Sequence, residues 1–281
     1  MKALVIGATG LLGQALIGQW TGDEVVGLGS RDVDIRDRAR VRQIVEENHP
    51  DWIVLAAAYT DVDGCETNRE LAFSVNRDGA VNVAHAARHA RARLLFLSSD
   101  YVFEGNKTSP YEIDDSRNPQ SVYGRTKAEA EIALVGILPQ CSIVRTSWVF
   151  GVGGKCFPET ILKLATSRPT LDVVQDQRGC PTYTVDLARA IVELCHQDAS
   201  GLVHVTNSGE CSWFEFAREI VARAGLTSEV RPISSQQIAR PAPRPRYSVL
   251  AATSRQHYRI EMPEWKDALG RYLEERNQSA S

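Results

Sequence analysis

In the first half of the chain, short runs of consecutive apolar residues alternate with longer segments in which apolar residues recur every three to four positions. The short runs predict β-strands at residues 2–7, 24–28, 52–57, 94–97 and 141–147. The periodic segments predict helices from the first turn to about residue 20 and at residues 37–48, 66–90 (with a break near Phe73) and 121–138. Strands that are apolar throughout are typical of a parallel sheet buried on both faces. The alternation therefore predicts an α/β fold with a doubly wound parallel sheet and right-handed crossovers.

Beyond Gly151 the apolar runs shorten and proline becomes frequent, which indicates a second, smaller α/β domain. The pattern predicts helices at residues 155–167, 185–196, 212–224 and 263–275, and strands at residues 171–174 and 202–206. Ser212 and Glu215 form a capping-box pattern at the start of one of these helices. Residues 240–246 read R-P-A-P-R-P-R, which predicts a stiff, extended loop. We expect a first domain at residues 1–150, which also receives the helix near 184–197, and a second domain at 151–281.

Composition and charge are those of an ordinary globular protein: 43% of the residues are hydrophobic, 24% are charged, and the formal net charge is −3. Because the chain has no basic block, we expect neither nucleic acid nor a membrane as its partner. The N-terminal apolar run ends at Gly7 and is too short for a signal peptide or a membrane span. The six cysteines are scattered without zinc-binding spacing, so we expect reduced thiols, a cytoplasmic protein and no structural metal.

Gly7, Gly10 and Gly13 form a G-x-x-G-x-x-G pattern directly after the first predicted strand and at the head of the next helix. A helix N-terminus offers free N–H groups and the positive end of the helix dipole, and residues without side chains let a pyrophosphate approach the backbone. The pattern alone also fits a tight turn that binds nothing. Within a chain of alternating strands and helices, it predicts a dinucleotide-binding domain of the Rossmann type.

The end of the second predicted strand bears on which nicotinamide cofactor binds. The strand is followed by Gly-Ser-Arg, ending at Arg31, and a hydroxyl with a guanidinium suits the 2′-phosphate of NADPH. Asp32 and Asp34 lie close by and offer the alternative of binding the ribose 2′-hydroxyl of NADH. We expect NADPH as the preferred cofactor, NADH as the alternative, and Asp34 with Ile35 against the adenine.

Tyr123 and Lys127 lie four positions apart on a predicted helix, and therefore on one face of it. A free tyrosine titrates near pH ~10, so we expect the ammonium of Lys127 to lower the pKa of Tyr123 and to bind ribose hydroxyls as well. Ser99 follows the strand at residues 94–97, where its hydroxyl can bind a substrate oxygen. A Tyr–Lys pair of this spacing also arises by chance. Together with Ser99 and the glycine turn, however, it predicts acid–base chemistry at a carbonyl.

These residues and their flanks resemble the dTDP-4-dehydrorhamnose reductase family, in the extended branch of the short-chain dehydrogenase/reductase superfamily. The similar segments lie at residues 56–63, 98–103, 118–127, 145–150, 176–182 and 244–250, although the resemblance weakens after Gly209. It implies a Rossmann domain with a smaller C-terminal substrate domain. It also implies an oxidoreductase of dTDP-rhamnose biosynthesis, in which NAD(P)H reduces the 4-keto carbon of dTDP-4-dehydro-6-deoxy-L-mannose to give dTDP-L-rhamnose.

The resemblance implies roles for individual residues as well. Tyr123 would donate the proton, Ser99 would polarise the carbonyl, and Lys127 would hold the ribose. The expected cofactor-binding residues are Gly7, Thr9, Gly10, Leu11, Leu12, Arg31, Asp34, Ile35, Ala56, Ala57, Ala58, Thr60, Tyr123 and Lys127. The expected substrate-binding residues are Ser99, Asp100, Tyr101, Tyr123 and Trp148. Core packing of Trp148 and loop capping by Asp100 are the alternatives.

Other functions share parts of this pattern. A sugar-nucleotide 4,6-dehydratase needs an Asp-Glu pair beside the hydroxyl, whereas Asp100 is followed here by Tyr101. A C4-epimerase would retain its nicotinamide, and a reductase of another nucleotide-linked 4-keto-deoxysugar would share the same residues. A non-catalytic relative, similar to the regulatory subunit of methionine adenosyltransferase, would keep the fold and bind a partner enzyme.

Three further expectations accompany the resemblance. Asn76 is either a polar residue that supports the active site or an ordinary helical residue. Some family members bind magnesium at a dimer interface through acidic side chains, but Gln14 and Ala15 occupy the first helix where an acid would be required, so we expect no metal. A homodimer is compatible with the family, and the sequence leaves the oligomeric state open.

Overall fold

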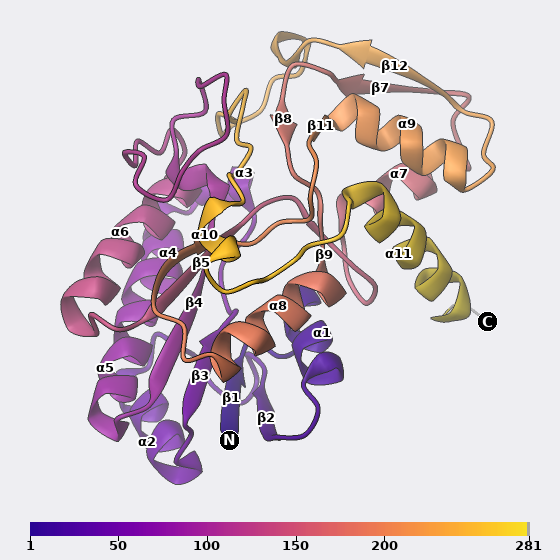
Figure 1. Ribbon diagram of the computed structural model, residues 1–281. Coiled ribbons are helices and arrows are strands. Elements are labelled where there is room, and N and C mark those ends of the chain that lie inside the picture. Colours follow the sequence, from indigo (N-terminus) through magenta and orange to yellow (C-terminus); the bar gives the residue numbers. More distant parts are fainter. Residues whose placement is uncertain (280–281) are drawn as a thin grey trace.

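The computed structural model describes residues 1–279, and its centre is a six-stranded parallel sheet (Figure 1). The strands are β1 (Lys2–Ile6), β2 (Glu24–Leu28), β3 (Trp52–Leu55), β4 (Arg93–Ser99), β5 (Ser142–Thr146) and β10 (Gly201–His204). Their order is β10-β5-β4-β3-β1-β2, so the winding direction reverses between β1 and β3 and opens a crevice at the carboxyl ends of these strands. The predicted doubly wound sheet is confirmed. Because β10 follows residue 150, the sheet takes in residues from both sides of the expected domain boundary.

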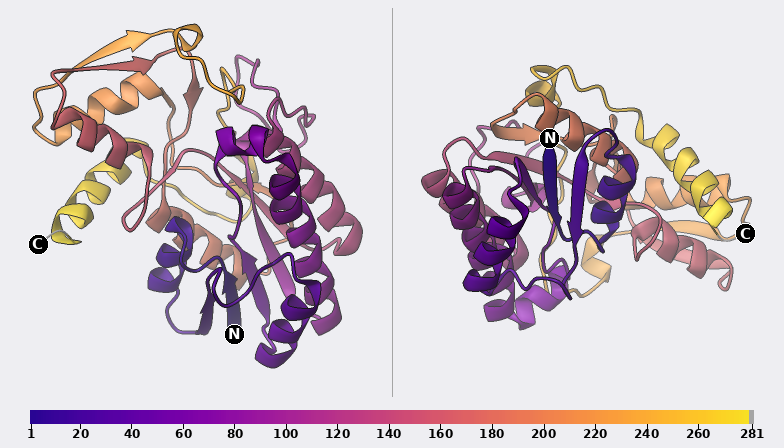
Figure 2. Two further views of the ribbon diagram at one scale, coloured as in Figure 1. Left: turned by 180° about the vertical axis from the view of Figure 1, so that it is seen from behind. Right: turned by 90° about the horizontal axis from the view of Figure 1, so that it is seen from below.

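Helices cover both faces of this sheet (Figure 2). One layer holds α2 (Arg38–Asn48), α5 (Ala80–Ala90) and α6 (Val122–Ile137), and the other holds α1 (Leu11–Gln19) and α8 (Thr184–His196). Alternate residues of β1 point to opposite layers: Leu4 and Ile6 pack against the first, and Ala3 and Val5 against the second. Within residues 1–279, no helix combines the length and apolar character needed to cross a membrane.

A smaller lobe lies beyond the carboxyl ends of the strands (Figure 1). It holds α7 (Phe157–Ala165), α9 (Trp213–Arg223) and α11 (Trp265–Ser279), with the parallel pair β7 (Thr170–Val174) and β12 (Glu229–Ile233) and the antiparallel pair β8 (Arg178–Gly179) and β11 (Cys211–Ser212). The remaining elements are the pair β6 (Val149–Phe150) and β9 (Thr182–Tyr183), the helix α10 (Thr253–Gln256), and 3-10 turns at Asp100–Val102 and Ser235–Gln237. The capping box of α9 is present, since Ser212 and Glu215 bond reciprocally.

The helix predicted at residues 66–90 consists of four segments: α3 (Val62–Thr67), α4 (Arg69–Phe73), a π-helical turn (Ser74–Gly79) and α5. The predicted break near Phe73 marks the start of the π-helical turn. This turn carries the buried Asn76, whose amide accepts a hydrogen bond from Tyr59 N (2.7 Å) and donates to Tyr59 O (3.0 Å). The amide also donates to Oγ1 of Thr126 on α6 (3.0 Å). Asn76 therefore joins the loop after β3 to α6, which is a supporting role and not that of an ordinary helical residue.

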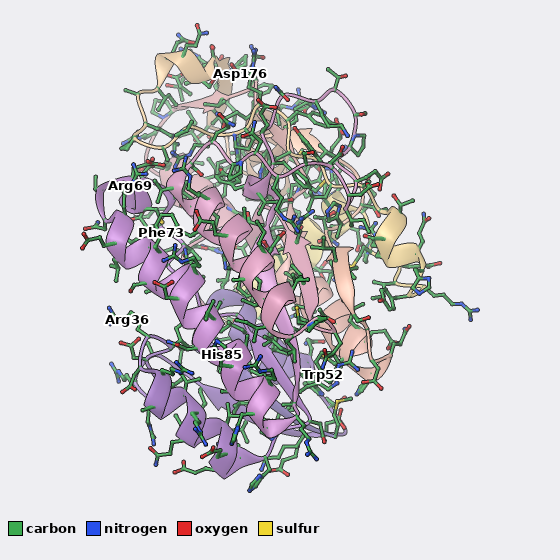
Figure 3. All side chains as sticks on the ribbon, turned by 90° about the vertical axis from the view of Figure 1, so that its left-hand side faces the viewer. Arg36, Trp52, Arg69, Phe73, His85 and Asp176 are labelled. Atoms are coloured by element: carbon green, nitrogen blue, oxygen red, sulfur yellow. The ribbon has the colours of Figure 1, made fainter. Side chains whose placement is uncertain are left out.

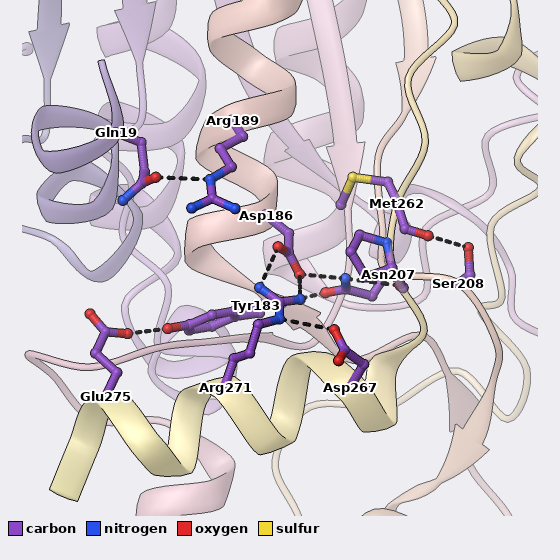
Figure 4. Close-up of polar contacts among 11 residues, drawn as sticks. Gln19, Tyr183, Asp186, Arg189, Asn207, Ser208, Met262, Asp267, Arg271 and Glu275 are labelled. Atoms are coloured by element: carbon purple, nitrogen blue, oxygen red, sulfur yellow. Dashed lines mark hydrogen bonds and ion pairs between the residues drawn. The ribbon is translucent and has the colours of Figure 1, made fainter. Parts of the chain in front are cut away.

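A polar network holds the C-terminal helix α11 against α8 (Figure 4). The buried Asp186 of α8 accepts hydrogen bonds from both terminal nitrogens of Arg271 (2.8 and 2.7 Å) and from Asn207 (2.7 Å). One turn further along α11, Glu275 accepts a hydrogen bond from the hydroxyl of Tyr183. The network thus joins the smaller lobe to a helix that packs under the main sheet.

Among residues 1–279, the ion pair between Glu131 of α6 and Arg145 of β5 has both side chains at 0% exposure. Two hydrogen bonds of 2.9 and 2.7 Å join the guanidinium to the carboxylate. Ser98 on β4 and Arg117 donate to the same carboxylate at 2.5 and 2.6 Å. Burial raises the pKa of Glu131, but its hydrogen bonds and charge interaction with Arg145 outweigh burial and hold the pKa below the usual value.

We predict that Arg145→Met lowers the free energy of unfolding by about 3–5 kcal/mol, because it leaves the buried Glu131 carboxylate without its main partner. Urea denaturation followed by circular dichroism measures this change. Arg231→Met is the matched control, since Arg231 pairs with Glu229 on the surface, and this variant is expected to unfold at the wild-type midpoint. Unchanged stability of Arg145→Met would show that the buried pair contributes little to the fold.

Candidate active site

The glycine turn lies tightly against the loop that follows β3. Gly7 has a φ of +101°, and a Cβ at this position would lie 2.5 Å from Ala57 N. A Cβ at Gly13 would lie 2.0 Å from Gly7 O. Neither position can therefore accept a side chain, and the turn leaves the N-terminus of α1 accessible to an anionic ligand.

A cavity of about 670 Å³ extends from this turn along the carboxyl edge of the sheet. Every residue that we expected to bind a cofactor lines it except Arg31: Gly7, Thr9, Gly10, Leu11, Leu12, Asp34, Ile35, Ala56, Ala57, Ala58, Thr60, Tyr123 and Lys127. Thr146, at the end of β5, also lines the cavity, and its buried hydroxyl has no hydrogen-bond partner within residues 1–279. The cavity lining thus combines the glycine turn, apolar side chains and a hydroxyl that is available to a ligand.

The residues after β2 bear on the predicted role of Arg31. Arg31 is exposed and lies outside the cavity lining, whereas Arg36 is part of the lining and projects at the edge of the molecule in Figure 3. Nε and a terminal nitrogen of Arg36 donate to both oxygens of Asp34 at 2.6–3.0 Å. The carboxylate of Asp32 accepts a hydrogen bond from the N–H of Gly29 (2.7 Å) and thereby stabilises the turn after β2. Sequence reasoning missed Arg36 because its direction depends on the ion pair with Asp34.

The carboxyl end of β4 and the start of α6 bring the expected catalytic residues together. Ser99 is buried, and its Oγ donates to Oδ1 of Asp100 (2.9 Å) and accepts a hydrogen bond from the N–H of Tyr101 (3.1 Å). Lys127 lies one turn beyond Tyr123 on α6, and its Nζ donates to the carbonyl of Leu97 (2.8 Å). A hydroxyl, a phenol and an ammonium therefore meet at the edge of the cofactor cavity.

The pKa of Tyr123 is shifted in the opposite direction to the one expected from the sequence. Burial raises the pKa of Tyr123 well above its usual value, and the negative charge of Asp100 raises it further. The expected lowering by Lys127 is therefore wrong, because desolvation dominates and the ammonium is directed at Leu97 O. Burial lowers the pKa of Lys127 to about 8 and raises that of Asp100 to about 6. At neutral pH, Tyr123 is a protonated phenol that can donate a proton.

A second cleft, of about 600 Å³, lies between the 3-10 turn after β4 and the smaller lobe. Its walls include Tyr101, the aromatic rings of Phe157 and Trp213, and the guanidinium groups of Arg240 and Arg244. Sequence reasoning did not single out Phe157, Trp213 or Arg240, because nothing in their local pattern shows that α7, α9 and residues 240–246 face one cleft.

The remaining expected substrate residues lie behind these walls. Ser99 and Asp100 line neither cavity and are nearly fully buried. Trp148 also lines neither: its indole stacks on Trp213, with centroids 3.4 Å apart and planes 8° from parallel. Its backbone has a φ of +46°, which is uncommon for a bulky residue, and the absence of a side chain at Gly179 makes room for the ring.

Tyr123 links the linings of the two cavities through its contact with Tyr101. Its side chain lines the cofactor cavity, and its ring packs edge-to-face on Tyr101, with centroids 5.8 Å apart and planes at 77°. Tyr101 in turn lines the second cleft. The phenol of Tyr123 thus lies between a cavity suited to a dinucleotide and a cleft with cationic and aromatic walls. This geometry suits transfer between two ligands that lie side by side.

Comparisons with known proteins agree with this geometry. The family model described as "RmlD substrate binding domain" matches residues 1–278. The spore coat polysaccharide biosynthesis protein SpsK of Bacillus subtilis is 40% identical over 98% of both chains. The dTDP-4-keto-6-deoxy-D-glucose reductase of Streptomyces niveus is 41% identical over 88% of this chain and 87% of its own.

A solved structure matches equally well. The dTDP-4-dehydrorhamnose reductase of Bacillus anthracis, determined in complex with NADP, is 35% identical over 98% of this chain and 99% of its own. The two structures superpose with a TM-score of 0.95. Because the family model spans nearly the whole sequence and the similarity extends through both lobes, the resemblance seen in the sequence motifs is confirmed. This chain belongs to the dTDP-4-dehydrorhamnose reductase family, within the extended short-chain dehydrogenases/reductases.

Proposed function

We propose that the protein is an NADPH-dependent reductase of a dTDP-linked 4-keto-6-deoxysugar. The specific substrate is dTDP-4-dehydro-6-deoxy-L-mannose and the product is dTDP-L-rhamnose. The observation that carries this proposal is the position of Tyr123 between the glycine-cradled cavity and the second cleft. The printed names of the relatives, which are reductases of dTDP-keto sugars, support the same reaction class.

The residues of the first cavity fit a nicotinamide dinucleotide. The glycine turn admits a pyrophosphate, Asp34 and Ile35 meet the adenine, and the unpartnered Thr146 hydroxyl is available on the opposite wall. NADPH is preferred over NADH because Arg36 supplies a guanidinium at the ribose end of the cavity, and the Bacillus anthracis relative was solved with NADP. The cofactor supplies the hydride when it is bound.

The protein's own side chains handle the developing negative charge and the proton. In the free protein the Ser99 hydroxyl donates to Asp100, and we propose that it turns to the keto oxygen when the substrate binds and polarises the carbonyl. Tyr123 keeps its proton at neutral pH and delivers it to the same oxygen as the alkoxide forms. Lys127, one turn away on α6, lines the cofactor cavity, and its ammonium turns from the carbonyl of Leu97 to the ribose hydroxyls when the cofactor binds.

The second cleft suits the nucleotide part of the substrate. Arg240 and Arg244 provide charge for a diphosphate, and Phe157 and Trp213 provide flat surfaces for a base or a sugar ring. Trp148 supports the cleft from behind through its stack with Trp213. We keep Tyr101 as a sugar contact because it lines the second cleft and packs on Tyr123. Asp100 is buried beside it and reaches the sugar only if the turn after β4 moves on binding.

Two observations bear on the alternatives. Tyr101 occupies the position at which a 4,6-dehydratase needs a glutamate, so elimination of water lacks half of its acid–base pair. Tyr123 and Lys127 line the first cavity, with Ser99 buried beside them, and this set argues against a purely regulatory protein. The Streptomyces niveus relative acts on a different dTDP-4-keto sugar by its name, so a reductase of a related 4-ketose is the second candidate.

Location and assembly complete the proposal. All six cysteines are buried free thiols within residues 1–279, which suits a reducing cytoplasm. A homodimer remains a proposal that sedimentation analysis can test.

Substrate identity is tested by supplying enzymatically generated dTDP-4-keto-rhamnose and identifying the product by NMR. A product other than dTDP-L-rhamnose would favour the second candidate.

We predict that Tyr123→Phe lowers kcat by about 10²–10⁴-fold, because the proton donor is lost while the ring contact with Tyr101 is kept. NADPH oxidation in the presence of the keto-sugar measures the rate. Tyr258→Phe is the matched control: it removes a hydroxyl bonded to Ser200, beyond the C-terminal end of α8 and outside both cavity linings, and should leave kcat unchanged. Undiminished activity of Tyr123→Phe would remove Tyr123 from the mechanism.

The pKa of about 8 for Lys127 predicts how the reaction depends on pH. The ammonium is present below this pKa and is lost as pH rises through it. We expect kcat/KM for NADPH, which reports the free enzyme, to be constant near pH 7 and to fall about tenfold per pH unit above pH ~8. A profile that stays flat to pH ~10 would show that the charge of Lys127 is not required.

Cofactor preference distinguishes Arg36 from Arg31. We predict that Arg36→Ala raises the Kd for NADPH about tenfold and leaves that for NADH unchanged, because only NADPH carries the 2′-phosphate. Fluorescence titration with each cofactor measures both constants. Arg31→Ala is the matched control, with no expected effect. Should Arg31→Ala instead carry the loss, the sequence-based assignment would be right and the cavity-based one wrong.

A further inference from the structure

One wall of the second cleft is an extended segment with few contacts of its own. We call residues 240–246 the proline strap; its three prolines lack N–H groups, and it forms no helix or strand. Four of its residues line the cleft: Arg240, Ala242, Pro243 and Arg244. The strap must therefore be fixed by contacts with other elements if the cleft is to have a defined shape.

The two ends of the strap are fixed in different ways. At its C-terminal end, the N–H groups of Arg246 and Tyr247 donate to the carbonyl of Gly105 at 3.1 and 3.0 Å. The upstream part, which forms the cleft wall, is held by a side chain of the other lobe: Asp63, on α3. In Figure 1 the gold segment of the strap passes beside α3.

Asp63 binds the strap at three points. Its Oδ1 accepts hydrogen bonds from Ala242 N (3.1 Å) and from one terminal nitrogen of Arg244 (2.5 Å), and its Oδ2 accepts from the other (2.7 Å). Arg240 lies 3.9 Å from the same carboxylate. The Arg244 side chain is only 12% exposed, so this bidentate pair is better shielded from solvent than a surface salt bridge.

The contact continues to the catalytic tyrosine. Arg244 and Tyr101 both line the second cleft, and the ring of Tyr101 packs edge-to-face on Tyr123. Asp63 itself lines neither cavity. Its effect on a ligand in the second cleft must therefore pass through the strap, and above all through Arg244.

We propose that Asp63 is a positioning residue for nucleotide-sugar binding: it holds Arg244 in the cleft wall, so that the substrate diphosphate meets a guanidinium already in place. The inference rests on the proposed function for the identity of the ligand. Ordering a long arginine side chain on a flexible segment costs binding free energy, and an ion pair formed beforehand removes that cost. Asp63 also links the lobe that binds the cofactor to the wall that binds the sugar nucleotide.

The first test measures binding without turnover, using dTDP as the probe in isothermal titration calorimetry. Asp63→Asn is expected to weaken dTDP binding about tenfold and to leave NADPH binding unchanged. Asp61→Asn is the matched control, because Asp61 lies on the same loop but only caps α3 through Gly64 N (2.9 Å), a role that asparagine can fill. Unchanged or tighter dTDP binding by Asp63→Asn would overturn the proposal, since tighter binding would mean that Asp63 competes with the ligand.

A double-mutant cycle tests whether Asp63 acts through Arg244. Arg244→Gln is expected to weaken dTDP binding at least as much as Asp63→Asn. The double variant should then bind like Arg244→Gln alone, because the carboxylate has lost the group it positions. If the fold-decrease in dTDP affinity of the double variant equals the product of the two single decreases, the two residues act independently, and this result would also overturn the proposal.

Steady-state kinetics separate positioning from general damage. We expect Asp63→Asn to raise KM for the keto-sugar nucleotide about tenfold with kcat changed less than about twofold, since only substrate binding depends on the strap. A parallel rise in KM for NADPH would indicate loss of structure and contradict the positioning role. A wild-type enzyme that binds dTDP but does not reduce the keto-sugar would refute the proposed function alone, whereas one that does not bind dTDP would refute the placement of the nucleotide.

Discussion

The buried carboxylate of Glu131 is the interaction on which the geometry of the active site depends. It lies on the same face of α6 as Tyr123 and Lys127, at successive intervals of four residues. Ser98, the neighbour of Ser99 on β4, donates to it, and Arg145 donates to it from β5. Fixing this one carboxylate therefore sets how far α6 is advanced and rotated against the end of β4. The distance between the serine hydroxyl and the tyrosine follows from it.

Much of the fold was predictable from the sequence, because a parallel sheet buried on both faces requires strands that are apolar throughout. The glycine turn was predictable for a similar reason, since Gly7 and Gly13 lie where no Cβ fits. The strand β12 was missed: Pro232 lies within it, and it is only half-buried beside β7 at the edge of the smaller lobe. A position that accepts only one type of residue, such as a glycine turn, can be recognised from the sequence. An element whose formation depends on packing against distant parts of the chain cannot.

The site residues likewise fall into those that local geometry predicts and those that depend on tertiary contacts. Ser99, Tyr123 and Lys127 were predicted because their spacing follows strand and helix geometry. Arg31 stays a prediction, because a side chain on a turn takes its direction from its partners, and in the folded chain it is Arg36, the partner of Asp34, that lines the cavity. The raised pKa of Tyr123 was also missed, since it comes from burial by elements distant in sequence. The far wall of the second cleft could not be assembled from the sequence for the same reason: α7, α9 and the proline strap meet only in the folded chain.

The π-helical turn at Ser74–Gly79 has a consequence for how this region can change in evolution. A π-helical turn holds one more residue than the α-helical turn that it replaces. Deleting a single residue there would restore a continuous α-helix, and α5 could keep its packing on the sheet. Asn76 would then rotate away from Tyr59 and Thr126, and the loop after β3 would lose its link to α6. A gap of one position in this segment would therefore mark relatives that keep the fold but support their active site differently.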